Sequence, residues 1–106
     1  MPTNRPPTTE SVKSKRMTLA FPNECRSFDS KRNRVRFWGY DRAIEISFFV
    51  DAEALEKLNP EMGAAEAGML EAFDAARERI QGVADYVYSC DRNRSYAYSL
   101  TAKDFG

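Results

Sequence analysis

The sequence contains no histidine, the side chain that most often serves as a general base or a metal ligand near neutral pH. Its two cysteines, Cys25 and Cys90, lie far apart and form no CxxC pair, so the chain has no zinc-binding pattern. A cysteine nucleophile would also lack its usual histidine partner. Glycine-rich phosphate loops, GxSxG elbows and HExxH helices are missing as well. The sequence therefore predicts no catalytic residue, no cofactor and no metal, and we expect a protein that is not an enzyme.

Long hydrophobic runs are also missing. No apolar stretch approaches the roughly 18 residues that a membrane-spanning helix needs. The first residues, MPTNRPPTTESVKSKR, lack the apolar segment and the cleavage site of a secretory signal. We therefore predict a cytoplasmic protein that does not bind membranes. In that compartment the two cysteines are expected to be reduced thiols in small, semi-buried positions.

Neither sign of charge is in excess, because 16 basic residues balance 16 acidic ones. The balance is uneven along the chain. Residues 1–16 hold four basic residues and one acidic residue, a charge of +3, and the remaining 12 basic and 15 acidic residues give −3. This mildly acidic body weakens any case for general affinity toward nucleic acids.

The length of 106 residues allows one domain. Residues 1–16 hold three prolines and almost no large apolar side chain, so they cannot offset the entropy of ordering and are predicted to be a disordered basic tail. The composition changes at Met17. This methionine is an alternative translation start, and if it is the true start, residues 1–16 lie upstream of the protein. Residues 17–106 are predicted to form a single α+β domain.

Alternation of apolar and polar residues predicts a β-hairpin over residues 34–50. With a two-residue turn at Asp41-Arg42, Phe37 lies opposite Ile46, and Trp38 lies opposite Glu45. A register shifted by two residues keeps the same faces and remains open, as does a longer loop that uses Gly39. The apolar face predicted to lie in the core consists of Val35, Phe37, Ile44, Ile46, Phe48 and Val50.

Two helices are predicted after the hairpin. Asp51 is a suitable N-cap for a short helix over residues 52–58, which Asn59-Pro60 ends. A long amphipathic helix over about residues 64–89 follows, and Asp74 and Arg77 on its polar side form a predicted structural ion pair. Its apolar stripe favours packing on the sheet over a coiled-coil dimer and consists of Met69, Phe73, Ala76, Ile80, Val83 and Val87.

Short strands complete the predicted sheet. Alternation in SYAYSLT predicts a C-terminal strand over about residues 95–101, and residues 17–21 form an additional N-terminal strand candidate. Residues 23–33 are rich in turn-forming residues and are predicted to be a loop. The fold class is therefore α+β: a small antiparallel sheet with a short and a long helix packed on one of its faces.

The second face of the hairpin is the candidate interaction surface. A single helical layer covers one face of a sheet, so the aromatic residues of the other face would be exposed, as they are in protein interfaces. We expect a protein partner or a second copy of the chain to bind there, which makes the protein a small accessory or interaction module. Residues 17–21, Phe28 or the short helix could instead cover this face. The candidate residues are Arg34, Arg36, Trp38, Tyr40, Glu45 and Phe49.

Weak nucleic-acid binding is the alternative function. Basic residues in Lys31–Arg36 and Arg92–Arg94 could contact phosphates, and the aromatic residues of the hairpin could stack on bases. Against this stand the acidic body and Glu45, which can neutralise Arg36 across the strands. Protein contact is therefore the favoured prediction.

Three segments carry a family resemblance: FPNECRSFDSKRNRVRFWGYDRAIEISFFVDAEAL, AFDAARERI and SYAYSLTAKDF. Together they resemble the bacterial family known as domain of unknown function 1488, over nearly all of Met17 to Phe105. The resemblance implies an α+β fold with a small antiparallel sheet and helices, and it implies no activity. Asp74 and Arg77 match the family motif, whose role is open.

Overall fold

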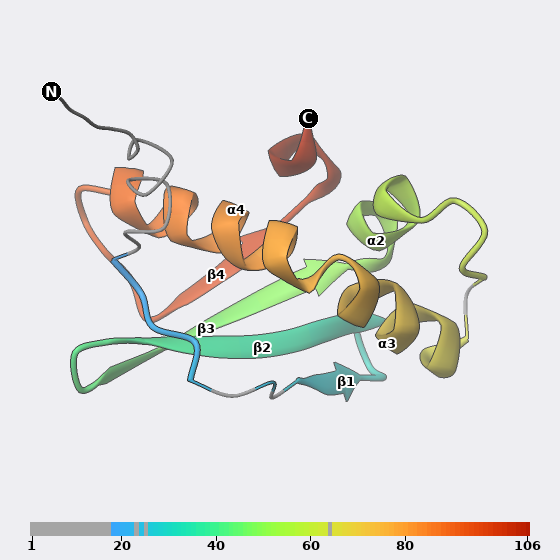
Figure 1. Cartoon of the computed structure of the whole chain (residues 1–106), viewed down its shortest axis with the longest axis horizontal. Coiled ribbons are helices and arrows are strands. Elements are labelled where there is room, and N and C mark those ends of the chain that lie inside the picture. Colours follow the sequence, from blue (N-terminus) through green and yellow to red (C-terminus); the bar gives the residue numbers. More distant parts are fainter. Residues whose placement is uncertain (1–17, 23, 25, 64) are drawn as a thin grey trace, which may run out of the picture.

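The computed structural model describes residues 18–22, 24, 26–63 and 65–106, and it shows one sheet with helices on one side (Figure 1). The predicted tail and the alternative start at Met17 lie outside these residues. The α+β class is confirmed. The elements are β1 (Ser27–Asp29), β2 (Arg34–Asp41), β3 (Ile44–Asp51), α2 (Ala52–Leu58), α3 (Glu66–Ala75), α4 (Arg77–Cys90), β4 (Ala97–Leu100) and the 3-10 helix η2 (Ala102–Phe105).

Strands β2 and β3 form the predicted hairpin, in the register shifted by two residues. Phe37 pairs with Phe48 and Trp38 pairs with Ser47, so the two-residue turn is Arg42-Ala43 and not Asp41-Arg42. Arg42 holds a positive φ of 61° in this turn. The shift leaves every side chain on its predicted face, because side chains alternate with a period of two.

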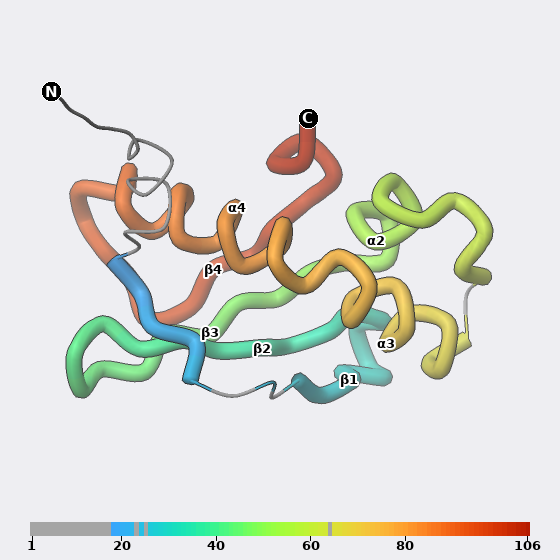
Figure 2. Tube along the Cα trace, in the orientation of Figure 1, coloured from blue at the N-terminus to red at the C-terminus, as the bar shows by residue number. Residues whose placement is uncertain are grey.

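The described residues 18–22 run from the end of α4 to the edge of β2 (Figure 2). Ala20 forms an isolated antiparallel bridge with Tyr40, which takes the place of the predicted strand over residues 17–21. The Phe21 ring lies against Gly39, where a Cβ atom would come within 2.6 Å of it, and lies 6.1 Å from the Phe37 ring. Glycine in the middle of β2 therefore makes room for this aromatic ring.

Strand β1 lies within the segment that was predicted to be a loop. It pairs antiparallel with β2, and the sheet order is β1-β2-β3-β4. Strand β4 runs parallel to β3, so the sheet is mixed, and the prediction of an antiparallel sheet was wrong for this strand. The three helices between β3 and β4 form the long connection that a parallel pair requires.

Helix α2 has the predicted bounds and cap. The Asp51 carboxylate accepts a hydrogen bond of 2.9 Å from the Ala54 amide, and Leu55 is fully buried. The 3-10 helix η2 packs beside α2, and the Lys57 ammonium donates a hydrogen bond to the Ala102 carbonyl at 3.3 Å. The Asp51 cap at the start of α2 satisfies a backbone amide that the first helical turn otherwise leaves without a partner.

The predicted long helix is instead two helices that meet at Ala76, whose backbone has φ −111° and ψ 19°. Alanine favours a helix, so local preference does not cause the break. Tertiary packing does: Phe73 packs on Phe37 of β2 at 5.2 Å between ring centroids, and Tyr88 packs on Tyr98 of β4 at 5.9 Å. The bend lets one helical layer follow the twisted sheet across three strands.

The core lies between the inner sheet face and these helices. Ile44 was predicted to belong to it, but its side chain is 48% exposed, because the residue sits beside the turn and beyond the helical layer. Val83 and Val87 of the predicted stripe are only partly buried. The fully buried large side chains are Phe37, Phe48, Phe73, Ile46, Leu55, Met69, Ile80, Leu100, Val35 and Val50.

Within the described ranges, none of the helices is long and apolar enough to cross a membrane. Cys90 is an exposed free thiol at the end of α4, although a semi-buried position was predicted for it. Cys25 lies outside the described residues.

Candidate interaction surface

The face of the sheet turned away from the helices, called here the outer sheet face, is the candidate site. Helices α2, α3 and α4 all lie on the other side, and no helix or strand of the described residues covers this face (Figure 1). Phe21 and Phe28 pack against the inner core, so neither covers it. The outer sheet face consists of Ser27, Asp29, Arg34, Arg36, Trp38, Tyr40, Glu45, Ser47, Phe49, Ala97 and Ser99.

Arg36 joins strands β2 and β3 on this face. Its guanidinium lies 4.4 Å from the centre of the Trp38 ring and donates hydrogen bonds to Glu45 at 3.0 Å and to the Ser47 hydroxyl at 2.9 Å. A guanidinium that stacks on a ring and binds a carboxylate has few remaining rotamers. Arg36 and Trp38 therefore form a rigid unit.

Arg34 forms a second arginine–aromatic unit on the same face. Its guanidinium lies 3.8 Å from the centre of the Phe49 ring and donates to the Asp29 carboxylate at 2.9 Å. This hydrogen bond lowers the pKa of Asp29 below its ordinary value, and burial opposes the shift. The face thus carries two arginine–aromatic stacks, each held by a carboxylate from a neighbouring strand.

The structure brings together five of the six predicted surface residues in these two units, and Tyr40 lies half-buried on the same face. The aromatic rings are half-buried under the arginines and not openly exposed, which corrects the prediction of a bare apolar patch. Ser47 and Asp29 were not recognised as partners. The signal for Asp29 is the Asp29–Arg34 spacing across a four-residue turn in which Asn33 holds a positive φ of 53°.

The predicted ion pair of Asp74 and Arg77 forms at 2.8 Å, and Arg26 adds two further hydrogen bonds to the same carboxylate. These bonds tie the segment before β1 to the end of α3. The pKa of Asp74 is lowered, first by the hydrogen bond from Arg26 and then by its charge and by Arg77. Arg26 was not predicted, because it is 48 positions away in the sequence.

Because Arg26 and Arg77 both bind the Asp74 carboxylate, we predict that the free energy of unfolding depends on pH in the acidic range. A lowered folded pKa means that Asp74 stabilises the fold above its ordinary pKa of 3.8 and loses this contribution as the pH falls further. Its side chain is 43% exposed, so solvent screening limits the contribution to about 1 kcal/mol. Asp74→Asn should lower the free energy of urea unfolding by about that amount at neutral pH and by almost nothing at pH 2.

The control for this prediction is Glu71→Gln, which changes an exposed carboxylate of α3 that forms no ion pair with a described residue. It should leave the unfolding free energy nearly unchanged at both pH values. An equal loss for Asp74→Asn at neutral and acidic pH would contradict the ionic origin of the effect.

A hollow of about 730 Å³ lies at the break between α3 and α4. Four of its charged groups are engaged within the chain: Asp74 binds Arg26 and Arg77, and Arg79 donates to the Phe105 carbonyl at 2.7 Å. These four groups are therefore structural. The lining residues are Glu24, Arg26, Asp74, Ala75, Ala76, Arg77, Glu78 and Arg79.

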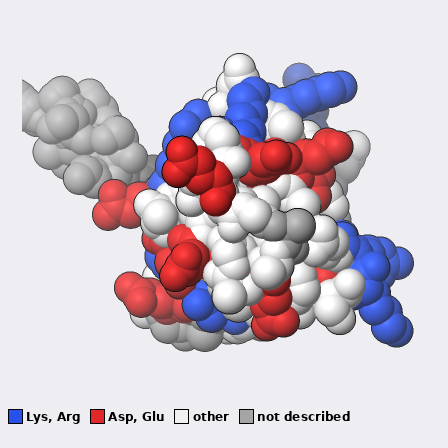
Figure 3. Space-filling model, turned by 90° about the vertical axis from the view of Figure 1, so that its right-hand side faces the viewer, with Lys and Arg blue, Asp and Glu red and all other residues white. Residues whose placement is uncertain are grey.

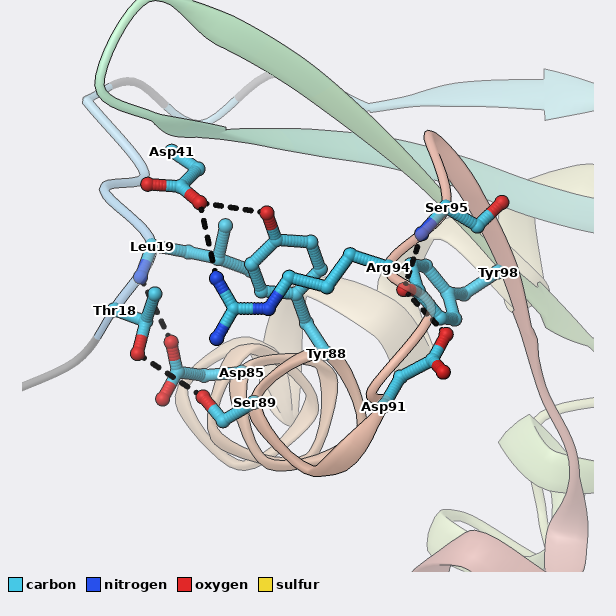
Figure 4. A network of polar contacts seen from close by, with 10 residues as sticks. All are labelled: Thr18, Leu19, Asp41, Asp85, Tyr88, Ser89, Asp91, Arg94, Ser95 and Tyr98. Atoms are coloured by element: carbon cyan, nitrogen blue, oxygen red, sulfur yellow. Dashed lines mark hydrogen bonds and ion pairs between the residues drawn. The ribbon is translucent and has the colours of Figure 1, made fainter.

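A second polar network joins the hairpin turn to the end of α4 (Figure 4). The Tyr88 hydroxyl donates to Asp41 at 2.6 Å, and Arg94 lies 3.6 Å from the same carboxylate and stacks on the Tyr88 ring. The bond to Asp41 raises the pKa of Tyr88. The network fixes the position of the turn relative to the helices.

Further polar contacts lie on either side of the Asp41–Tyr88–Arg94 group (Figure 4). The Leu19 amide donates to Asp85 at 2.8 Å, and the Tyr98 hydroxyl donates to Asp91 at 2.8 Å. Burial raises the pKa of Tyr98. These contacts hold the N-terminal segment and the α4–β4 loop in place, so they are structural as well.

The described residues contain no group of three acidic, cysteine or histidine side chains that could hold a metal ion. Charge does not gather by sign at the end formed by α2 and α3 either, where acidic and basic side chains are interspersed (Figure 3). The arginine–aromatic units of the outer sheet face therefore remain the candidate site.

Comparison with known proteins finds a family that matches most of the chain. The model of the family described as a protein of unknown function, DUF1488, matches residues 19–100. A crystal structure at 1.60 Å resolution of a DUF1488-family protein of unknown function from Shewanella loihica PV-4 is similar, with a TM-score of 0.66 and 17% identity. The similarity covers 80% of this chain and 93% of that one, and at this identity it shows the fold alone. No curated protein matches the chain.

Proposed function

The chain belongs to the DUF1488 family of proteins of unknown function, and from this premise we propose that it is a cytoplasmic, non-catalytic interaction module that binds a second copy of itself through the outer sheet face. One observation carries the proposal: two rigid arginine–aromatic stacks lie on a face that no described helix or strand covers. The exposed free thiol of Cys90 suits a reducing compartment.

The residue types of this face are those that dominate binding energy in protein interfaces. Tryptophan, tyrosine and arginine are enriched among interface hot spots. The aromatic side chains bury large areas at a small cost in side-chain entropy. The stacks hold Arg34 and Arg36 in fixed positions in the free protein. Binding of a partner therefore costs little additional side-chain entropy at these two arginines.

Charge favours a protein surface over a nucleic acid. Each arginine of the face already has a carboxylate partner, Asp29 for Arg34 and Glu45 for Arg36, so these four residues are neutral together. A phosphate backbone would have to compete with both carboxylates for the guanidinium groups. A second copy brings the same neutral surface and adds no net repulsion.

The proposal predicts a dimer that depends on the face. Sedimentation over a concentration series should show a monomer–dimer equilibrium, and Phe49→Arg or Trp38→Ala should weaken the association about 30-fold, the result of losing a hot-spot contact of about 2 kcal/mol. Far-UV circular dichroism and the thermal midpoint show whether each variant remains folded. Tyr86→Arg is the matched control, because Tyr86 is 69% exposed on α4 and its replacement should leave the dimer intact.

Two outcomes would contradict this proposal. One is a monomer over the whole concentration series. The other is retention on single-stranded DNA that falls steeply with salt and is lost when Arg34 and Arg36 become alanine, which would assign the face to nucleic acid.

A further inference from the structure

The two basic segments of the sequence lie at opposite ends of the hairpin. Lys31 and Arg32 lie in the turn before β2, and the eight residues of β2, a length of about 26 Å, separate this turn from the next one. The loop that carries Arg92–Arg94 lies beside the second turn, because Arg94 pairs with Asp41 at 3.6 Å (Figure 4). The end formed by residues 41–44, 91–96 and 18–19 is called here the hairpin-turn end.

Two arginines of the hairpin-turn end, Arg42 and Arg92, are exposed, and neither side chain forms a hydrogen bond or an ion pair with a described residue. Arg34 and Arg36 of the outer sheet face differ, because each is already held by a carboxylate. A guanidinium is charged at every physiological pH and offers parallel N–H groups to a phosphate. Phosphate oxygens therefore bind Arg42 and Arg92 without displacing a partner.

The charge of this end is positive once the preceding sequence is counted. Asp41, Asp91 and the neighbouring Asp85 accept hydrogen bonds of 2.6 to 2.8 Å from groups of the same chain, and they balance the three arginines of this end. Residues 1–16 carry a further charge of +3. The described chain begins at this end, where the Thr18 hydroxyl lies 3.0 Å from that of Ser89. The basic segment thus joins the domain beside the unpaired arginines.

An uncovered aromatic ring lies at the same end. Tyr96 is 70% exposed, and no described arginine stacks on it, in contrast to Trp38 and Phe49 of the outer sheet face. Its carbonyl accepts a hydrogen bond of 2.8 Å from the Ser47 amide, so its backbone is fixed against β3. Every nucleic-acid base has a flat face that stacks on such a ring.

We propose that the hairpin-turn end binds single-stranded nucleic acid, with Arg42 and Arg92 on the phosphate backbone and a base stacked on Tyr96. The chemistry of this partner supplies both kinds of group, phosphates along the chain and planar bases beside them. None of these contacts reads the edge of a base, so binding is independent of sequence. Because few phosphates are neutralised, the affinity is low and falls with salt.

The experiment measures fluorescence anisotropy of a labelled oligo-dT of about 16 nucleotides, with the full chain and over a series of salt concentrations. Arg42→Gln and Arg92→Gln should each reduce the slope of log affinity against log salt by about 0.7, the contribution of one contact to a single strand. Tyr96→Ala should weaken binding at least about fivefold at fixed salt and leave the slope unchanged, because a stacked ring releases no counterions.

The matched controls are Lys31→Gln and Arg32→Gln, which remove the same charge at the other end of β2. The separation of about 26 Å exceeds the screening length of about 10 Å at 0.1 M salt, so both should leave affinity and slope nearly unchanged. Far-UV circular dichroism shows whether each variant remains folded. An equal loss in the controls would reduce the effect to diffuse attraction and overturn the site.

The other failures are separable from those of the proposed function. Absence of oligo-dT binding at about 50 mM salt overturns this inference and leaves self-association through the outer sheet face standing. Binding that Arg34→Ala and Arg36→Ala abolish, and that Arg42→Gln and Arg92→Gln retain, overturns both proposals. Polyglutamate that binds as tightly as oligo-dT, with Tyr96→Ala without effect on either, assigns the arginines to an acidic protein segment and overturns the choice of partner.

Discussion

Replacing Phe37 by alanine should lower the free energy of unfolding by about 3–5 kcal/mol, a large part of the 5–15 kcal/mol that a small domain has in total. The reason is the position of this ring. Phe37 is 1% exposed, and its centroid lies 5.3 Å from the Phe48 ring, 5.2 Å from the Phe73 ring and 6.1 Å from the Phe21 ring. It therefore joins both central strands to α3 and to the N-terminal segment.

Urea unfolding followed by far-UV circular dichroism measures this loss. Tyr96→Ala is the control, because Tyr96 is also aromatic but is 70% exposed, so its loss should change the free energy by no more than about 0.5 kcal/mol. If Phe37→Ala cost only about 1 kcal/mol, the four rings could not be the close-packed centre of the core.

Gly68→Ala should destabilise the protein by about 1–3 kcal/mol, although the same change in most helices stabilises by up to about 1 kcal/mol. Gly68 lies in the first turn of α3, and a Cβ atom there would overlap the carbonyl oxygen of Met62. The oxygen belongs to the backbone, so a side-chain rotation cannot relieve the overlap. The loop before α3 would have to move away from the helix.

Gly82→Ala is the matched comparison, because a Cβ atom at Gly82 in α4 would meet nothing within 4 Å. The variant should gain up to about 1 kcal/mol from helix propensity. Thermal unfolding of the two variants should therefore move the midpoint in opposite directions. A gain of stability in both variants would show that the loop carrying Met62 gives way at little cost.

The strands of the hairpin could be predicted because alternation with a period of two is a local signal. The register could not, because a shift of two residues keeps Phe37 on the same face and the pattern is identical. The structure supports one register through distant residues: Asp41 accepts a hydrogen bond from Tyr88, 47 positions away, when the turn is Arg42-Ala43. Such a contact has no counterpart in the local pattern.

The helical region shows the same limit. The cap at Asp51 is a local feature, and α2 was predicted with its observed bounds. The break at Ala76 depends on which strands Phe73 and Tyr88 contact, and the sequence there favours an unbroken helix. The direction of β4 likewise depends on the path of the long connection and not on its own residues.

For the candidate surface, the sequence predicted the residues but not how they interact. Arg34, Arg36, Trp38 and Phe49 share a face by alternation alone. Arg34 covers Phe49, its diagonal neighbour on β3, so this stack follows from the register, whereas Arg36 covers Trp38, two positions along its own strand. Asp29 was missed because β1 has only three residues, too few to show a period.

The parallel pairing of β4 has a consequence for the order in which the chain can fold. Val50 pairs with Leu100, fifty positions later, whereas Asp41 and Ile44 pair across a two-residue turn. Loop-closure entropy opposes the distant pair until the intervening helices are compact, and the hairpin has no such delay. We therefore expect β4 to join the sheet late in folding. Until then the edge of β3 is unpaired and can form hydrogen bonds with a strand of another molecule.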